Sequence, residues 1–197
     1  MKNIRLAIAQ IGPSLGDLER NLDLHLEYVR RACDEDADVV MFPEQSLTGY
    51  FLSDLVTDVA VPRDDDRLKP LREASMDIDI VVGFIEETAD HRFVPAAGYL
   101  HKGNWKHIHH KIYLVTYGLF DEARDLAAGS TVRAFTTPIG RLAMLICEDL
   151  WHPSTASIAA SDGADIIYGL SSSPGRGIAG GTPELGSSET WHTLNRM

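Results

Sequence analysis

The chain has 197 residues, of which 44% are hydrophobic and 24% are charged, and its formal net charge is −11. This length allows one substantial hydrophobic core rather than two independent domains. The negative charge disfavours nucleic acids and anionic membrane surfaces as partners, because both would be repelled.

Neither the cysteines nor the apolar segments indicate an exported or membrane protein. The two cysteines, Cys33 and Cys147, form no CxxC motif, so a disulfide scaffold is disfavoured and a reducing compartment is expected. The N-terminal apolar stretch is too short for a signal peptide, and no segment reaches the roughly 18 apolar residues of a membrane span. We therefore expect a soluble cytoplasmic protein.

The first part of the chain alternates strand and helix patterns. Residues 5–11 form a short apolar run, expected to be a strand buried on both faces. Asp17 can cap a helix whose apolar positions recur every three or four residues, namely Leu18, Leu22, Leu26, Val29 and Cys33. Cys33 is therefore expected to be a small core residue. A second buried strand over residues 38–44 completes a strand–helix–strand unit, which predicts a layered α/β fold.

The middle of the chain predicts a helix and two hairpins. The charge-rich residues 63–75 indicate a helix that starts at the acidic run 64–66, and a strand over residues 78–87 follows. Gly103-Asn104 lies between two strand-like runs and predicts a hairpin turn, and a second hairpin is expected around residues 138–140. Because an all-parallel sheet contains no hairpins, we expect mixed sheets.

The last part of the chain predicts a helix over residues 153–161 and a strand over residues 164–170. Residues 171–186 are rich in Ser, Gly and Pro and are expected to form a loop. A helix capped by Ser187 or Ser188 is expected after this loop.

Three strand-like runs end in a chemically active side chain, namely Glu44, Lys111 and Cys147. In layered α/β folds, side chains at strand ends converge on one crevice. A carboxylate can take the thiol proton as a general base, the thiolate can attack a carbonyl carbon, and the ammonium can stabilise the oxyanion and lower the thiol pKa. Taken singly, each residue is better explained as a surface carboxylate, a solvated lysine or a core thiol.

Three ordered motifs surround these residues: FPEQSLTGY at 42–50, HKIYLVTYGLFDEARDLAAG at 110–129 and LICEDLW at 145–151. Together they resemble the nitrilase superfamily of carbon–nitrogen hydrolases, and most closely the glutamine-amidase domain of glutamine-dependent NAD synthetases. The resemblance runs from residue 4 to the end of the chain. It implies an α/β fold, a four-layer αββα sandwich with mixed sheets, in a single domain over residues 1–197. Family members continue for several tens of residues further, so the resemblance also implies that the C-terminal portion is lacking.

By matching motif position, the resemblance assigns Glu44 as the base, Lys111 as the cation on the oxyanion side and Cys147 as the nucleophile. Glu122 would orient the lysine and the substrate amide, and the backbone N–H of Glu148 would contribute to the oxyanion hole. The substrate pocket would be lined by aromatic residues and by the loop over residues 171–177; these residues are Tyr117, Phe120, Trp151, Ser172 and Ser173.

The resemblance implies hydrolysis of a small linear amide, either glutamine-like or an ω-amide, through a cysteine thioester that releases ammonia. Two alternatives remain: an N-carbamoyl or β-ureido acid hydrolase on the same triad, and a non-catalytic protein of this fold that serves as a binding module. No metal or organic cofactor is required, and a homo-oligomer is expected.

Four histidines lie close together in the sequence, namely His101, His107, His109 and His110. His107 and His109 would share one face of a strand and His110 the other. No cysteine or carboxylate cluster at metal-ligand spacing accompanies them, so we expect packed or solvated strand residues rather than a metal site.

Overall fold

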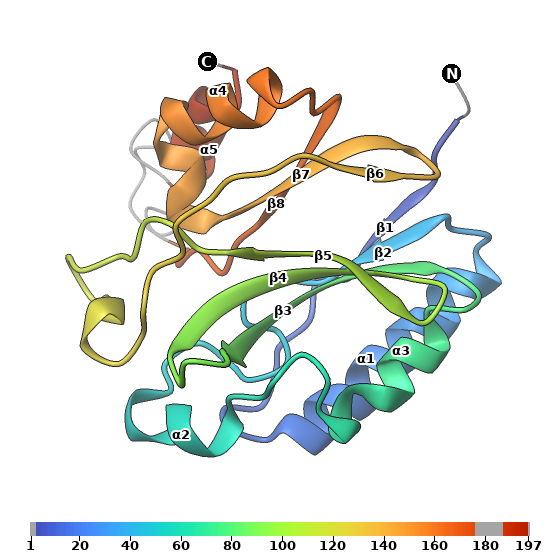
Figure 1. The fold of residues 1–197 in the computed structure, drawn as a ribbon, viewed down its shortest axis with the longest axis horizontal. Helices are drawn as coiled ribbons and strands as arrows, with labels where there is room; N and C mark the ends of the chain where they lie inside the picture. The colour runs from blue at the N-terminus through green and yellow to red at the C-terminus, as the bar shows by residue number, and fades with distance from the viewer. Residues whose placement is uncertain (1–2, 176–186, 197) are drawn as a thin grey trace.

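The computed structural model describes residues 3–175 and 187–196, whose strands form two sheets (Figure 1). The first sheet has the order β1-β2-β3-β4-β5, with β1, β2 and β3 parallel and β3, β4 and β5 antiparallel. Its strands are β1 (Leu6–Ile8), β2 (Val39–Met41), β3 (Asp79–Glu87), β4 (Phe93–His101) and β5 (Asn104–His110). The second sheet has the order β6-β7-β8, and its strands are β6 (Phe135–Thr137), β7 (Gly140–Ile146) and β8 (Ile166–Leu170). Both sheets are mixed, as the hairpins predict.

Helices cover the outer faces of the two sheets. Helices α1 (Leu18–Asp34) and α3 (Lys69–Ala74) lie on the first sheet, and α4 (Pro153–Ser161) lies on the second, with α5 (Ser187–Leu194) near it (Figure 1). The shorter helices are α2 (Val56–Val59), η1 (Ser53–Leu55), η2 (Asp66–Leu68), η3 (Glu122–Arg124) and η4 (Cys147–Trp151). The resulting order of layers, helix–sheet–sheet–helix, confirms the predicted αββα sandwich.

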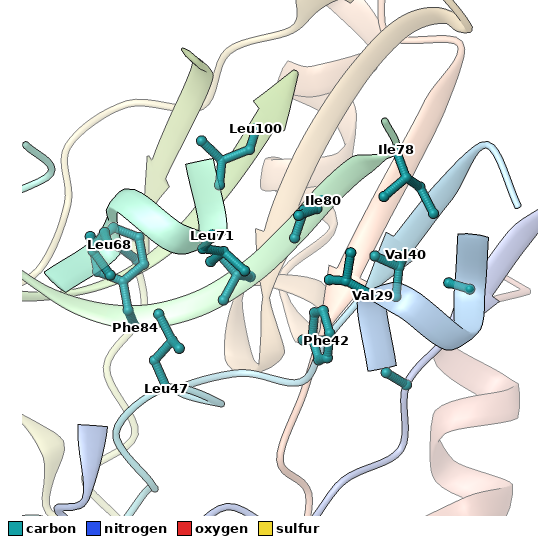
Figure 2. Packing of buried hydrophobic residues seen from close by; sticks show 14 of the residues in the cluster. Val29, Val40, Phe42, Leu47, Leu68, Leu71, Ile78, Ile80, Phe84 and Leu100 are labelled. Atoms are coloured by element: carbon teal, nitrogen blue, oxygen red, sulfur yellow. The ribbon is translucent and has the colours of Figure 1, made fainter. Parts of the chain in front are cut away.

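Successive side chains of a strand point to opposite faces of the sheet, and in the central strands both sets of side chains are apolar and buried. In β3, Ile80 and Phe84 belong to the core under α1 and α3 (Figure 2). Val81 packs toward the second sheet instead. In β7, Met144 faces the first sheet, whereas Leu145 faces α4. Because each of these strands is apolar on both faces, it reads in the sequence as a continuous apolar run.

The predicted start of the first helix is confirmed. Asp17 precedes α1, and its side chain accepts a hydrogen bond from the backbone N–H of Arg20. Cys33 packs against the core under α1, as its place on the apolar stripe predicts, and burial is the main cause that raises its pKa. The buried face of α1 also holds two polar residues, Asn21 and His25, which the apolar spacing did not predict.

The prediction for the first strand was wrong in length and burial. The strand extends only from Leu6 to Ile8, and Ile8 is 70% exposed. β1 is the edge of its sheet, and the core between the two sheets reaches β2, β3 and β4 through residues such as Val39 and Val81. Only the face carrying Ala7 packs against the helix-covered core. The second strand is likewise shorter than predicted, Val39–Met41 rather than 38–44.

Two other boundaries differ from the sequence prediction. The helix expected over residues 63–75 begins at Asp66, because Asp65 caps η2 by accepting the N–H of Arg67, and α3 then continues to Ala74. The first hairpin turns at Lys102-Gly103 rather than Gly103-Asn104, since Asn104 already pairs with His101. Lys102 and Gly103 both have positive φ, as a two-residue type I′ turn requires.

The remaining predicted elements agree with the structure within two residues at their boundaries. The strand expected over 164–170 is β8, the helix over 153–161 is α4, and the last helix begins at Ser187. Of the loop expected over 171–186, residues 176–186 lie outside the described residues. Among the helices that the structure describes, none is long and apolar enough to cross a membrane.

Candidate active site

Glu44 lies in a buried turn directly after β2 and is 2% exposed. The turn lies against β3 at Gly83, where a Cβ atom would come within 2.4 Å of the Pro43 carbonyl oxygen. Glycine therefore allows the backbone carrying Glu44 to approach the sheet this closely. Two buried polar residues of α1 anchor the same turn: Asn21 Nδ2 donates to the Leu47 carbonyl, and His25 Nε2 lies 2.9 Å from Ser46 Oγ.

Lys111 follows the last residue of β5, and its side chain is fully buried. Its Nζ donates to Glu44 Oε1 and to Glu122 Oε1, each at 2.7 Å. Glu44 and Glu122 lie 67 and 11 residues away in the sequence. We call these three residues the lysine cluster. A buried ammonium between two carboxylates has charge compensation that an isolated buried lysine lacks.

Glu122, the first residue of η3, is held in place by donors other than Lys111. Tyr50 OH donates to Glu122 Oε1, and the backbone N–H of Val115 donates to Oε2 at 2.8 Å. The Glu122 carboxylate is therefore fixed by a side chain and a backbone group as well as by the lysine. Tyr50 also places its ring 5.9 Å from Lys111 Nζ. Sequence reasoning did not select Tyr50, although it lies in the first motif.

Cys147 follows β7 as the first residue of η4, where its φ is +45°. A non-glycine residue in this left-handed region is uncommon and is held there by its surroundings. Ser171 Oγ donates to Cys147 Sγ at 3.4 Å, while the next residue, Ser172, donates its backbone N–H to Glu44 Oε2 at 3.0 Å. Two adjacent residues at the end of β8 thus bind the thiol and the lysine cluster.

Burial and charge together shift the pKa values of these groups. Burial is the main cause that raises the pKa of Cys147 to about 12, the Glu44 carboxylate raises it further, and Lys111 opposes the rise. Burial also raises the pKa of Glu44 against the opposing effect of Lys111. Burial alone would lower the pKa of Lys111, but Glu44 and Glu122 raise it above its usual value. The site therefore holds a protonated thiol beside a carboxylate with raised basicity and a permanent cation.

A pocket of about 260 Å³ opens over Cys147. Four of the predicted substrate-pocket residues line it, namely Tyr117, Phe120, Trp151 and Ser173, and so does Glu148. Pro174 also lines it and belongs to the predicted loop 171–177, whereas sequence reasoning missed the other lining residues: Val115, Ser187, Thr190 and Trp191. The α5 residues could not be assigned to the pocket from the sequence, because no motif links that helix to Cys147.

Two predicted substrate-binding residues lie outside the lining of this pocket. Glu122 is buried in the lysine cluster, and Ser172 contacts Glu44 through its N–H and through its Oγ, which donates to the Glu44 carbonyl at 2.8 Å. Within the predicted loop 171–177, residues 176 and 177 lie outside the described residues. The backbone N–H of Glu148 stays a predicted oxyanion donor; it lies near the start of η4, where helical N–H groups lack partners within the helix.

The four histidines each have a neighbour of their own. His101 bonds Asp79, His109 bonds Asp149 and His110 bonds Glu86. His107 stacks on Phe135, at 4.7 Å between ring centroids. In the part of the chain that the structure describes, no three potential ligands among His, Cys, Asp and Glu are grouped so as to hold a metal ion.

A family model described as "Carbon-nitrogen hydrolase" matches residues 5–196 of this chain. Among curated proteins, the glutamine-dependent NAD(+) synthetase of Thermotoga maritima is 32% identical over 179 residues, covering 88% of this chain and 31% of the relative. The corresponding synthetase of Acinetobacter baylyi is 29% identical over 175 residues, with 88% and 32% covered. The chain thus spans about a third of the length of these relatives.

Solved structures give the same result for the fold. The glutamine-dependent NAD+ synthetase of Acinetobacter baumannii superposes with a TM-score of 0.77 at 30% identity, covering 87% of this chain and 32% of that one. An amidase from Nesterenkonia sp. AN1, whose active-site cysteine carries acrylamide added by Michael addition, has a TM-score of 0.77 at 22% identity, with 86% and 67% covered.

Proposed function

Because the chain belongs to the carbon–nitrogen hydrolase family, we propose that it hydrolyses the carbon–nitrogen bond of a small linear amide and releases ammonia. The observation that carries this proposal is the buried lysine cluster beside Cys147, in which Lys111 Nζ bonds two carboxylates at 2.7 Å. A core thiol kept only for packing has no need of a carboxylate base and a buried cation next to it. The proposal concerns amide hydrolysis alone, since the chain spans 31% of the first synthetase relative.

In the proposed first stage, Cys147 Sγ attacks the amide carbonyl carbon while Glu44 takes the thiol proton. Concerted transfer is needed because the raised pKa of Cys147 leaves little free thiolate at neutral pH. Lys111 and the backbone N–H of Glu148 stabilise the oxyanion of the tetrahedral intermediate. Protonated Glu44 then gives its proton to the leaving nitrogen, the carbon–nitrogen bond breaks, and ammonia leaves a thioester on Cys147.

In the second stage, Glu44 accepts a proton from a water molecule as that water attacks the thioester carbonyl. The second tetrahedral intermediate collapses, the carbon–sulfur bond breaks, and the proton on Glu44 returns to Cys147 Sγ. The products are a carboxylic acid and the restored thiol. No step in this sequence draws on a metal or organic cofactor.

The charge of the pocket favours one group of amides. Among the described residues that line it, Glu148 is the one with a charged side chain, and Tyr117 OH donates to its Oε2 at 2.9 Å. A carboxylate in the pocket attracts a substrate that carries an ammonium group and disfavours one with only negative charges. This favours a glutamine-like amide over an anionic ω-amide or N-carbamoyl acid. The relatives named as glutamine-dependent synthetases support the same choice.

Ammonia release from a panel of substrates tests the proposal. The panel contains glutamine, asparagine, ω-amides of dicarboxylic acids and N-carbamoyl amino acids, each with the unmodified chain, Cys147→Ala and the matched control Cys33→Ala. We expect release from glutamine that Cys147→Ala abolishes and Cys33→Ala leaves unchanged. Release from the carbamoyl compounds alone would replace the amide assignment with a carbamoyl one. No release from any member, with all three proteins folded, would favour the binding module.

The cytoplasmic location inferred from the sequence and the homo-oligomer implied by the family resemblance stay predictions. Fractionation of cells that express the chain and sedimentation of the purified protein would test them directly.

A further inference from the structure

Asp149 is a fully buried carboxylate beside the candidate active site. Its Oδ1 accepts the backbone N–H groups of Ile112 and Tyr113, at 2.9 and 3.0 Å. Its Oδ2 accepts the Ile146 N–H at 3.0 Å and His109 Nε2 at 2.8 Å. A carboxylate offers about four acceptor positions, so these four donors use all of them.

The four donors lie next to the two reactive residues. His109 precedes and Ile112 follows Lys111 within two positions, while Ile146 directly precedes Cys147. Consecutive Cα atoms are about 3.8 Å apart, and each donor is one or two residues from Lys111 or Cys147. A shift in the backbone at any donor therefore also shifts Lys111 or Cys147. One side chain therefore holds the backbone on both sides of the lysine and the backbone immediately before the thiol.

The hydrogen bonds of Asp149 connect two segments that are not paired in the same β-sheet. Strand β5, which leads to Lys111, belongs to the first sheet, and β7, which leads to Cys147, belongs to the second. Within each sheet the register is set by strand pairing, but between the sheets it depends on side chains. Asp149 is itself anchored from the other side, since Thr155 Oγ1 of α4 donates to its backbone carbonyl.

We propose that Asp149, supported by His109, is a positioning residue that fixes the Lys111 ammonium relative to the Cys147 thiol across the two sheets. This inference rests on the proposed amide hydrolysis and adds a residue that acts through the reactive groups without touching substrate. Only an all-acceptor side chain suits the site. In asparagine an NH2 group replaces one of the two carboxylate oxygens, so its N–H groups would face two of the four donors and those hydrogen bonds would be lost.

The first test compares Asp149→Asn with Asp162→Asn in the full chain. Asp162 is a matched control, because its carboxylate also accepts a backbone N–H, from Ala134 at 2.8 Å, on the α4 side of the second sheet. A misplacement of about 1 Å costs on the order of 100-fold in rate, so we expect kcat of Asp149→Asn to fall about 30- to 100-fold with little change in KM. Asp162→Asn should keep its kcat at the unmodified value.

A second readout needs no amide substrate. The rate at which iodoacetamide alkylates Cys147, measured in a Cys33→Ser background, reports how well Glu44 and Lys111 are aligned with the thiol. We expect Asp149→Asn to slow this alkylation by about the same factor as kcat, on the order of 30- to 100-fold. Should the unmodified chain hydrolyse no amide at all, the proposed function fails, yet the alkylation rates still decide the role of Asp149.

His109 supplies a pair of variants in case Asp149→Asn does not fold. Gln can place an N–H donor near the position of His109 Nε2, whereas Leu cannot. His109→Gln should therefore keep the alkylation rate and kcat of the unmodified chain, and His109→Leu should lower both about tenfold. The proposal is overturned if Asp149→Asn folds and keeps both rates, or if His109→Gln and His109→Leu lose activity equally. A loss shared by Asp162→Asn would equally overturn it, because the effect would then be one of general stability.

Discussion

Two buried polar clusters lie toward opposite ends of β3, and they differ in the ionisable groups that they contain. The lysine cluster is near the end that carries Ile85, whose partner Pro95 accepts the backbone N–H of Lys111. The other, which we call the tyrosine cluster, comprises Asp79, Tyr99 and His101 at the start of the strand. Both contain a carboxylate that accepts hydrogen bonds from other side chains.

The tyrosine cluster satisfies one carboxylate with a hydroxyl and a ring nitrogen. Tyr99 OH donates to Asp79 Oδ2 at 2.6 Å, and His101 Nδ1 bonds Oδ1 at 2.5 Å. Burial and the Asp79 carboxylate raise the pKa of Tyr99, so the phenol stays protonated as a donor. The ring of Tyr99 packs edge-on against Phe135 in the core between the sheets. This arrangement suits a structural role.

The lysine cluster instead gathers one ammonium, two carboxylates and a nearby thiol under a pocket. Among the described residues, no buried side-chain nitrogen or oxygen lacks a hydrogen-bond partner, so satisfaction of polar groups does not distinguish the two clusters. What distinguishes them is the buried charge held beside a reactive group. Such charge costs solvation energy and is retained where it has a use.

Removal of the cation should have the largest effect. Lys111→Met leaves the Glu44 and Glu122 carboxylates buried without their shared partner, which should cost about 3–5 kcal/mol in the free energy of unfolding. Turnover should fall by about 10⁴-fold, because loss of the charge partner of the oxyanion and misplacement of Glu44 should each cost about 100-fold. Urea denaturation and ammonia release measure the two effects. A fully active Lys111→Met variant would show that the lysine cluster, like the tyrosine cluster, has only a structural role.

Glu44→Gln separates chemistry from stability within the lysine cluster. The amide keeps the size of the side chain and an oxygen for Lys111, and it loses one hydrogen bond, that from the Ser172 N–H, so the protein should stay folded. Without a general base at this position, kcat should fall by about 10³-fold. The pH–rate profile of the unmodified chain should show an acid limb above the usual glutamate pKa, because burial raises the pKa of Glu44. An acid limb at the ordinary value would contradict this assignment.

The titration of Cys147 tests the electrostatics directly. Its pKa is raised to about 12 from the usual 9.0, so in a Cys33→Ser background the ultraviolet absorbance of the thiolate should develop near pH 12. Glu44→Gln should bring this titration to lower pH, since the Glu44 carboxylate contributes to the rise. Formation of the thiolate near pH 9 would show that burial and Glu44 do not control the thiol.

Asp79→Asn should give the smallest effect on activity. The variant weakens two buried hydrogen bonds in the tyrosine cluster, which should cost about 1–3 kcal/mol in the free energy of unfolding. Its kcat should stay within about threefold of the unmodified value, because the site lies toward the other end of β3 and distant positions act independently. A larger loss of kcat in a folded Asp79→Asn protein would show that the tyrosine cluster influences the candidate active site.

Local pattern determined much of what could be predicted here. Asp17 caps α1 because the cap is an interaction between neighbours in the sequence, and α4 starts at Pro153 because proline is accepted in the first helical turn. The length of β1 was not predictable in this way. Its apolar residues match a buried strand, but burial depends on which strands of the second sheet lie over it.

The sequence by itself determined the layered fold and the mixed sheets, and it selected Glu44, Lys111 and Cys147 as candidate site residues, because periodicity, turn chemistry and motifs can be read from short segments. Only the tertiary structure decided that Glu44 reaches Lys111 across 67 residues, that Tyr50 holds Glu122 and that Trp191 lines the pocket. It also revealed the link through Asp149, whose donors include His109 of the first sheet and Ile146 of the second. These contacts depend on how distant segments pack together, and short-range sequence patterns do not predict that packing.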